Sequence, residues 1–69
     1  MISYEPLWKT MKDKKATTYT LRNKGKPYDV GSATVGRIKM GKSISTNTID
    51  AICKILDCDI LDIIKFVPD

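Results

Sequence analysis

The apolar residues of this 69-residue chain recur mostly three and four positions apart, which is the spacing of amphipathic helices. The pattern predicts four helices, over residues 4–14, 18–24, 31–40 and 46–56. A fifth helix is expected from Asp59 to about Val67. Because no segment competes by alternating apolar and polar residues, the sequence predicts an all-α fold.

Residues that start and stop helices fall at the ends of these segments. A side chain able to cap a helix precedes three of them, at Thr17, Ser45 and Asp59. Pro6 suits a first turn, where its missing amide costs nothing. Gly41 suits the end of the third helix because glycine enters the left-handed conformation cheaply. Residues 1–3 are expected to form a short extended lead, and residues 25–29 a loop.

Each predicted helix has an apolar face that would contribute to one core. The expected members are Tyr4, Leu7, Trp8 and Met11, then Tyr19 and Leu21, then Val30, Val35 and Ile38, and then Ile49, Ile52, Cys53 and Leu56. In the last helix the stripe is Ile60, Ile63, Ile64 and Val67, with Leu61 and Phe66 on its flanks. An apolar arc this wide indicates either a tightly wrapped core helix or a dimer contact through Leu61 and Phe66.

The helix over residues 31–40 is distinctive because the face opposite its apolar side carries mostly small side chains. That face carries Ser32, Ala33, Gly36, Arg37 and Lys39. Small residues with one long cation can lie flat in a DNA groove, whereas an ordinary amphipathic surface helix has the same pattern. The stretch alone leaves both interpretations open.

The composition of the chain favours some classes of function and excludes others. The net charge of +4 favours an anionic partner such as nucleic acid. A chain of this length predicts a single domain, residues 1–69, with a marginal core and no room for a buried catalytic cleft. The sequence contains no histidine, no nucleophile near a plausible base and no phosphate-binding glycine loop. We therefore expect that the protein is not an enzyme and that it binds no cofactor or small-molecule ligand.

The two cysteines, Cys53 and Cys58, are too few for a structural zinc site, so no metal is expected. We expect buried reduced thiols, and a disulfide between them is the alternative. No apolar run approaches the ~18 residues that span a membrane, and no signal peptide is recognised, so we expect a cytoplasmic protein.

Three stretches together, residues 17–21, residues 30–41 and the helix after Ser45, resemble the lambda-repressor and Cro-like (XRE-type) helix-turn-helix family. The opening Ile2–Trp8 and the segment Thr48–Cys58 resemble its branch of very small stand-alone regulators from Gram-positive bacteria and their mobile elements. The resemblance implies a compact five-helix domain whose third helix enters the major groove of DNA.

The resemblance also assigns roles to individual residues. It implies base-facing positions at Ser32, Ala33 and Arg37, and contacts to the DNA backbone at Thr18 and Lys42. Lys39 is expected to contact the backbone as well. Arg37 is the expected base reader because its fork matches the two acceptors of guanine. Two departures stand out: Arg22 replaces a usually small residue, and the link from Leu21 to Val30 is longer than usual. The extra residues Lys24, Lys26 and Tyr28 either add backbone contacts or are simply loop.

These observations predict a sequence-specific DNA-binding transcriptional regulator, acting as a repressor on double-stranded DNA. A homodimer is expected because one recognition helix covers too few base pairs to discriminate against a genome of competing sites. The alternative is a protein-interaction module that uses the same fold to bind another regulator through its apolar last helix.

Overall fold

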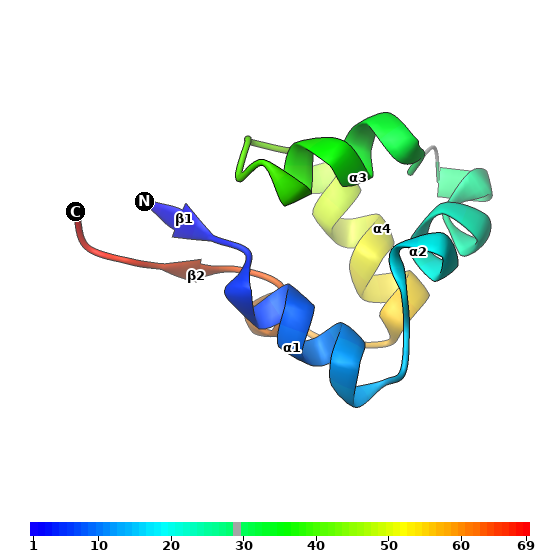
Figure 1. Cartoon of the computed structure of the whole chain (residues 1–69), viewed down its shortest axis with the longest axis horizontal. Helices are drawn as coiled ribbons and strands as arrows, with labels where there is room; N and C mark the ends of the chain where they lie inside the picture. Colours follow the sequence, from blue (N-terminus) through cyan, green and yellow to red (C-terminus); the bar gives the residue numbers. More distant parts are fainter. Residues whose placement is uncertain (29) are drawn as a thin grey trace.

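The computed structural model describes residues 1–28 and 30–69. In that part of the chain four α-helices surround one core, and two short strands extend to one side (Figure 1). The elements are β1 (Ile2–Ser3), α1 (Glu5–Asp13), α2 (Thr18–Lys24), the 3-10 helix η1 (Lys26–Tyr28), α3 (Ser32–Lys39), α4 (Thr46–Leu56), the 3-10 helix η2 (Ile60–Asp62) and β2 (Lys65–Phe66). The mainly helical fold is confirmed, but the described residues form four α-helices and not five.

The capping signals read from the sequence are confirmed at the first four helices. The Thr17 hydroxyl accepts from the amide of Thr20, and the Ser45 hydroxyl accepts from that of Thr48. Pro6 lies in the first turn of α1. Gly41, just after α3, adopts a φ of +72°, the left-handed conformation that favours glycine.

The core lies where α1, α2, α3, α4 and η2 meet. Its most deeply buried side chains are Leu7, Leu21, Ile52, Ile63 and Val30. Trp8 and Tyr19 were expected to join them, and both predictions are wrong because Trp8 is 37% and Tyr19 66% exposed. Two positions correspond to about 200° around a helix, so Tyr19 points away when Leu21 faces the core.

The predicted last helix is also wrong. Asp59 and Asp62 form a capping box, but the turn that they cap ends after Asp62. The chain then extends as β2, which pairs antiparallel with β1 so that Phe66 lies opposite Ile2. The β-branched Ile64 and Val67, which flank β2 on either side, suit an extended backbone. For these residues, pairing with the amino-terminal strand β1 is therefore favoured over continuing the helix.

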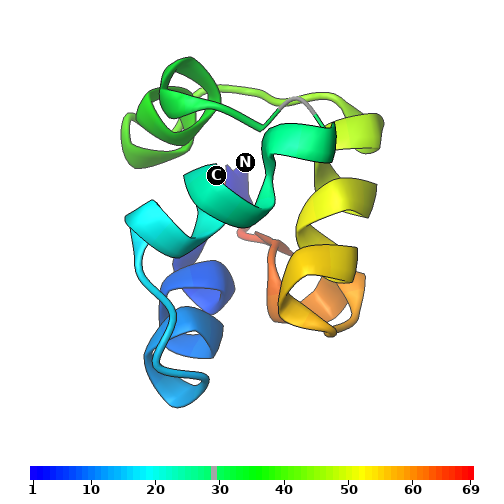
Figure 2. The same cartoon turned by 90° about the vertical axis from the view of Figure 1, so that its right-hand side faces the viewer.

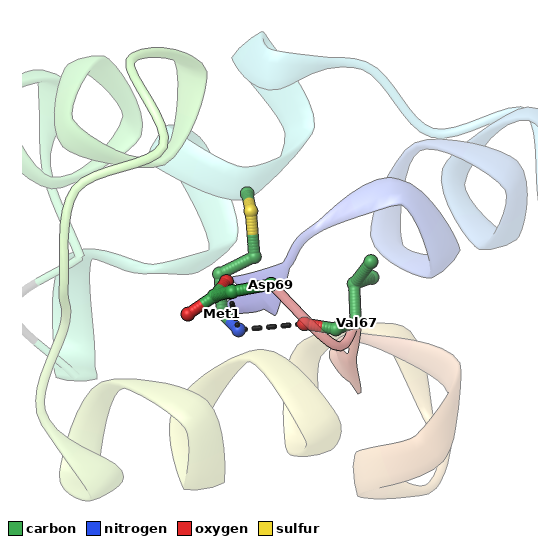
Figure 3. Close-up of polar contacts among 3 residues, drawn as sticks. All are labelled: Met1, Val67 and Asp69. Carbon is green, nitrogen blue, oxygen red and sulfur yellow. Dashed lines mark hydrogen bonds and ion pairs between the residues drawn. The ribbon is translucent and has the colours of Figure 1, made fainter.

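This correction changes the expected burial of the segment. Ile63 is fully buried, whereas Ile60, Leu61 and Phe66 are exposed. The chain ends extend the ribbon formed by β1 and β2, because the amide of Val67 donates to the carbonyl of Met1 at 2.8 Å. The Met1 ammonium in turn reaches the Val67 carbonyl at 2.6 Å and the Asp69 carboxylate at 3.0 Å (Figure 3).

None of the helices in the described residues is long and apolar enough to cross a membrane.

Candidate nucleic-acid interface

The packing of α2 against α3 depends on a tight turn between them. The carbonyl of Gly25 accepts hydrogen bonds from the amides of Tyr28 and Val30, at 2.9 and 3.0 Å. A Cβ atom on Gly25 would lie only 2.4 Å from the Leu21 carbonyl oxygen and 2.7 Å from Val30. Only glycine fits there, and this close approach brings the buried Val30 back beneath α2. In Figure 2 this part of the molecule faces the viewer, with α2 in cyan to teal and α3 in green.

A shallow hollow of about 160 Å³ runs between these two helices. It is lined by Thr18 and Arg22 from α2 and by Ser32, Val35, Gly36 and Lys39 from α3. Val35 forms its floor, since it is the buried member of the set. The structure thus brings together three predicted contact residues, Thr18, Ser32 and Lys39. Within the described residues, nothing lies within 4 Å of where a Cβ on Gly36 would stand, so this surface of α3 is open.

Arg37 lies on the other side of the exposed face of α3. Its Nε donates to the carbonyl of Ser43 at 3.3 Å, and it lines a second hollow with Thr34, Ser43, Ile44, Ser45 and Thr48. Its guanidinium therefore leans toward the α3–α4 loop and is separated from Ser32. The hydrogen bond uses one donor and orients the plane of the group, while the two terminal nitrogens remain available for other acceptors.

Lys42 follows Gly41 in a loop that is fixed from two directions. Its amide donates to the carbonyl of Arg37 at 2.9 Å, and its carbonyl accepts from the hydroxyl of Tyr4 at 2.6 Å. Tyr4 is buried beside α1, so the first helix determines where this loop stands. The Lys42 side chain itself is exposed.

Residues 6–69 match the Cro/C1-type HTH DNA-binding domain family. The chain belongs to this family. A crystal structure of the transcriptional regulator VanUg is similar to it, with a TM-score of 0.83 and 31% sequence identity, covering 99% of this chain and 87% of that chain. A comparison with curated proteins gave no match.

In this Cro/C1-type domain the charge is divided unevenly, a signal that the sequence analysis missed. Residues 16–49, which include the helix-turn-helix, hold six of the twelve basic residues and one of the eight acidic ones. The remainder holds six basic and seven acidic residues. The whole net positive charge therefore lies in the segment that contains α2 and α3. A count of charges by segment would have found it.

The long link between α2 and α3 is partly bound to the rest of the domain. The Lys54 ammonium lies 5.8 Å from the ring centroid of Tyr28 and 2.9 Å from the Asp50 carboxylate. Tyr28 thus packs toward α4, whereas Lys24 and Lys26 are exposed. Of the predicted loop 25–29, Asp29 lies outside the described residues.

The far end of α4 has the opposite character. Asp57, Asp59 and Asp62 line a depression there together with both cysteines, and Asp50, nearer the start of α4, borders the same depression. Burial raises the pKa of the Cys53 and Cys58 thiols; the charge of Asp59 raises the pKa of Cys53 further, and that of Asp62 raises both. Both are free, partly buried cysteines. A raised pKa keeps them as thiols, the form that is a poor nucleophile and a poor metal ligand.

The two residues predicted for a dimer contact do not share a helix. Leu61 is on η2 beside α1, where it borders a hollow with Lys9 and Asp13. Phe66 is on β2, opposite Ile2. Both side chains are exposed, at 76% and 70%.

Proposed function

We propose that this protein is a sequence-specific transcriptional regulator, a repressor, that inserts α3 into the major groove of double-stranded DNA. The observation that carries the proposal is the open, thin outer surface of α3 within the basic half of the domain. A helix can approach base edges closely only where its outer face lacks bulk. Membership of the Cro/C1-type family and the similarity to a transcriptional regulator support the same function.

Three residues are proposed to face the bases. Ser32 and Ala33 lie in the first turn of α3, the part of a recognition helix that contacts base edges in this class of domain. Ser32 can donate or accept, and Ala33 offers a methyl group to thymine. Arg37 supplies a fork of donors that matches the O6 and N7 atoms of guanine, with its Nε bond to Ser43 reducing the freedom of the side chain.

Three further residues are proposed to hold the DNA backbone. Thr18 and Lys39 line the hollow between α2 and α3, and Lys42 stands just beyond the carboxyl end of α3. Contacts of this kind set the position of the protein on the duplex and carry no direct sequence information.

We also propose a homodimer on a palindromic DNA site, in which the two-stranded ribbon of β1 and β2 in one copy contacts that of the other. Met1 and Val67 exchange two hydrogen bonds, so in the alternating antiparallel pattern the amide and carbonyl of Phe66 point away from β1. A second copy related by a two-fold axis can then pair its own β2 with this edge, Phe66 opposite Phe66. Leu61 is the other exposed apolar residue that we assign to the contact.

The test is selection of binding sites from a pool of random duplexes, followed by footprinting and by titration at several salt concentrations. We expect a palindrome with half-sites about one helical turn apart, and an affinity that falls steeply as salt rises. Placing the selected site within a promoter should lower transcription from a reporter. Failure to enrich any sequence would favour the interaction-module alternative, and increased transcription would overturn the repressor role.

A further inference from the structure

Arg22 is the residue at which this domain departs from the pattern expected of its family, and it is exposed on the basic surface. It stands one helical turn after Thr18, on the same side of α2. It borders two adjoining hollows. One is the α2–α3 hollow described above, and the other, of about 380 Å³, is lined by Arg22, Lys26, Val30, Gly31 and Ser32.

The long link explains how Lys26 comes to stand beside Arg22. The turn at Gly25 folds the chain back so that η1 starts immediately after α2. Lys26 then borders the same hollow as Arg22 and Ser32. A cation absent from the usual short link is thus added at the amino-terminal end of α3.

No carboxylate of the described residues borders either hollow. Within the same described residues, neither Arg22 nor Lys26 takes part in an ion pair. Arg22 offers five N–H donors and Lys26 three. Ser32, which lines both hollows, adds a hydroxyl. Donors gathered in this way suit an oxygen-rich anion such as a phosphodiester.

We propose that Arg22 and Lys26 bind a DNA backbone phosphate beside the amino-terminal end of α3. The inference rests on the proposed function and adds a contact to it. α3 has eight residues and is about 12 Å long, comparable with the width of the major groove. With Lys42 beyond its other end, the recognition helix is held to DNA on both sides.

The experiment measures the salt dependence of binding for Arg22→Ala, Arg22→Lys and Lys26→Ala, by fluorescence anisotropy. The probes are the selected palindrome and a random duplex of equal length. Because the two cations share one phosphate, each alanine variant should reduce the slope of log K against log salt by up to about one per protomer, equally on both probes. Arg22→Lys should keep the slope because the charge remains.

Lys9→Ala is the matched control, since Lys9 lies on α1 near Glu5 and Asp13 and lines neither of the two hollows. Its slope should equal that of the wild type. Slopes unchanged in both Arg22→Ala and Lys26→Ala overturn the inference, as does a loss confined to one base pair of the palindrome. If the wild type itself shows no salt-dependent binding, the proposed function fails instead. Circular dichroism confirms that each variant is folded.

Discussion

The segment 16–49 and the far end of α4 belong to one small domain but carry opposite charge. The first presents Arg22, Lys26 and Lys39 around α3, and the second presents Asp57, Asp59 and Asp62 around η2. α4 connects them, with its amino end near α3 and its carboxyl end directed away (Figure 1). A domain divided in this way should approach a polyanion in one orientation, because one end is attracted and the other repelled.

The two regions also differ in how apolar residues are used. Around α2 and α3 the Leu, Ile and Val side chains are buried, and the large apolar side chains that remain exposed are those of Tyr19, Tyr28 and Met40. At the chain ends, apolar side chains remain exposed on β1, β2 and η2, namely Met1, Ile2, Ile60, Leu61 and Phe66. The contrast agrees with the proposal made above, in which the region around α2 and α3 binds DNA and the chain ends contact a second copy.

The largest effect is expected where the two regions share a core. Ile52 is fully buried at the centre of α4, so Ile52→Ala should destabilise the fold by about 2–5 kcal/mol. A loss of this size can unfold so small a domain and would abolish DNA binding with it. Thermal unfolding measures the change. Ile60→Ala, at an exposed position, is the control and should shift the melting temperature little. Similar shifts in both variants would contradict the assignment.

The next effect sharpens the DNA-binding side of the comparison. Arg37→Ala should weaken binding to the selected palindrome by about 1–3 kcal/mol and relax the preference at one base pair. Arg37→Lys should lose most of that preference, because a lysine keeps the charge but not the fork. Binding is compared on the palindrome and on its single-base variants. An equal loss on every sequence would mean that Arg37 holds phosphate and reads no base.

The protein-binding side is tested by the double variant Leu61→Glu, Phe66→Glu. Because both side chains are exposed, the monomer should melt at nearly the wild-type temperature. Cooperative binding to the palindrome should be lost, with affinity lower by roughly tenfold, or about 1.4 kcal/mol. Sedimentation gives the number of protomers on the DNA. Wild-type protein saturating the palindrome with one protomer would exclude the dimer, and unfolding of the variant would place these residues in the core.

The regions differ as well in how far the sequence predicted them. The helices up to α4 follow from local signals, such as the hydroxyl of Thr17, the glycine at Gly41 and the spacing of Val35 and Ile38, and all of these are confirmed. The end of the chain depends on a partner more than sixty residues away, since β2 exists only through its pairing with β1. Helical spacing within residues 60–67 carries no information about that pairing.

For the interface, the sequence predicted which residues belong to α2 and α3 but not how they group. Thr18, Ser32 and Lys39 border one hollow, whereas Arg37 turns toward Ser43. That separation depends on the loop after Gly41, which Tyr4 holds from α1 through a hydrogen bond across the fold. The roles of all these residues in DNA binding remain predictions.

The smallest effect concerns that loop. Lys42→Ala should weaken binding almost uniformly on all sequences, by less than about 1 kcal/mol at moderate salt, because it removes one phosphate contact and no base contact. The slope of log K against log salt should fall by about one per protomer.

Tyr4→Phe is the control variant, since it removes the hydrogen bond to the Lys42 carbonyl and leaves the lysine charge in place. It should reduce affinity while keeping the slope, because a looser loop still carries the cation. A Lys42→Ala slope equal to that of the wild type would remove Lys42 from the interface. The basic region would then contact DNA only through α2, the α2–α3 link and α3.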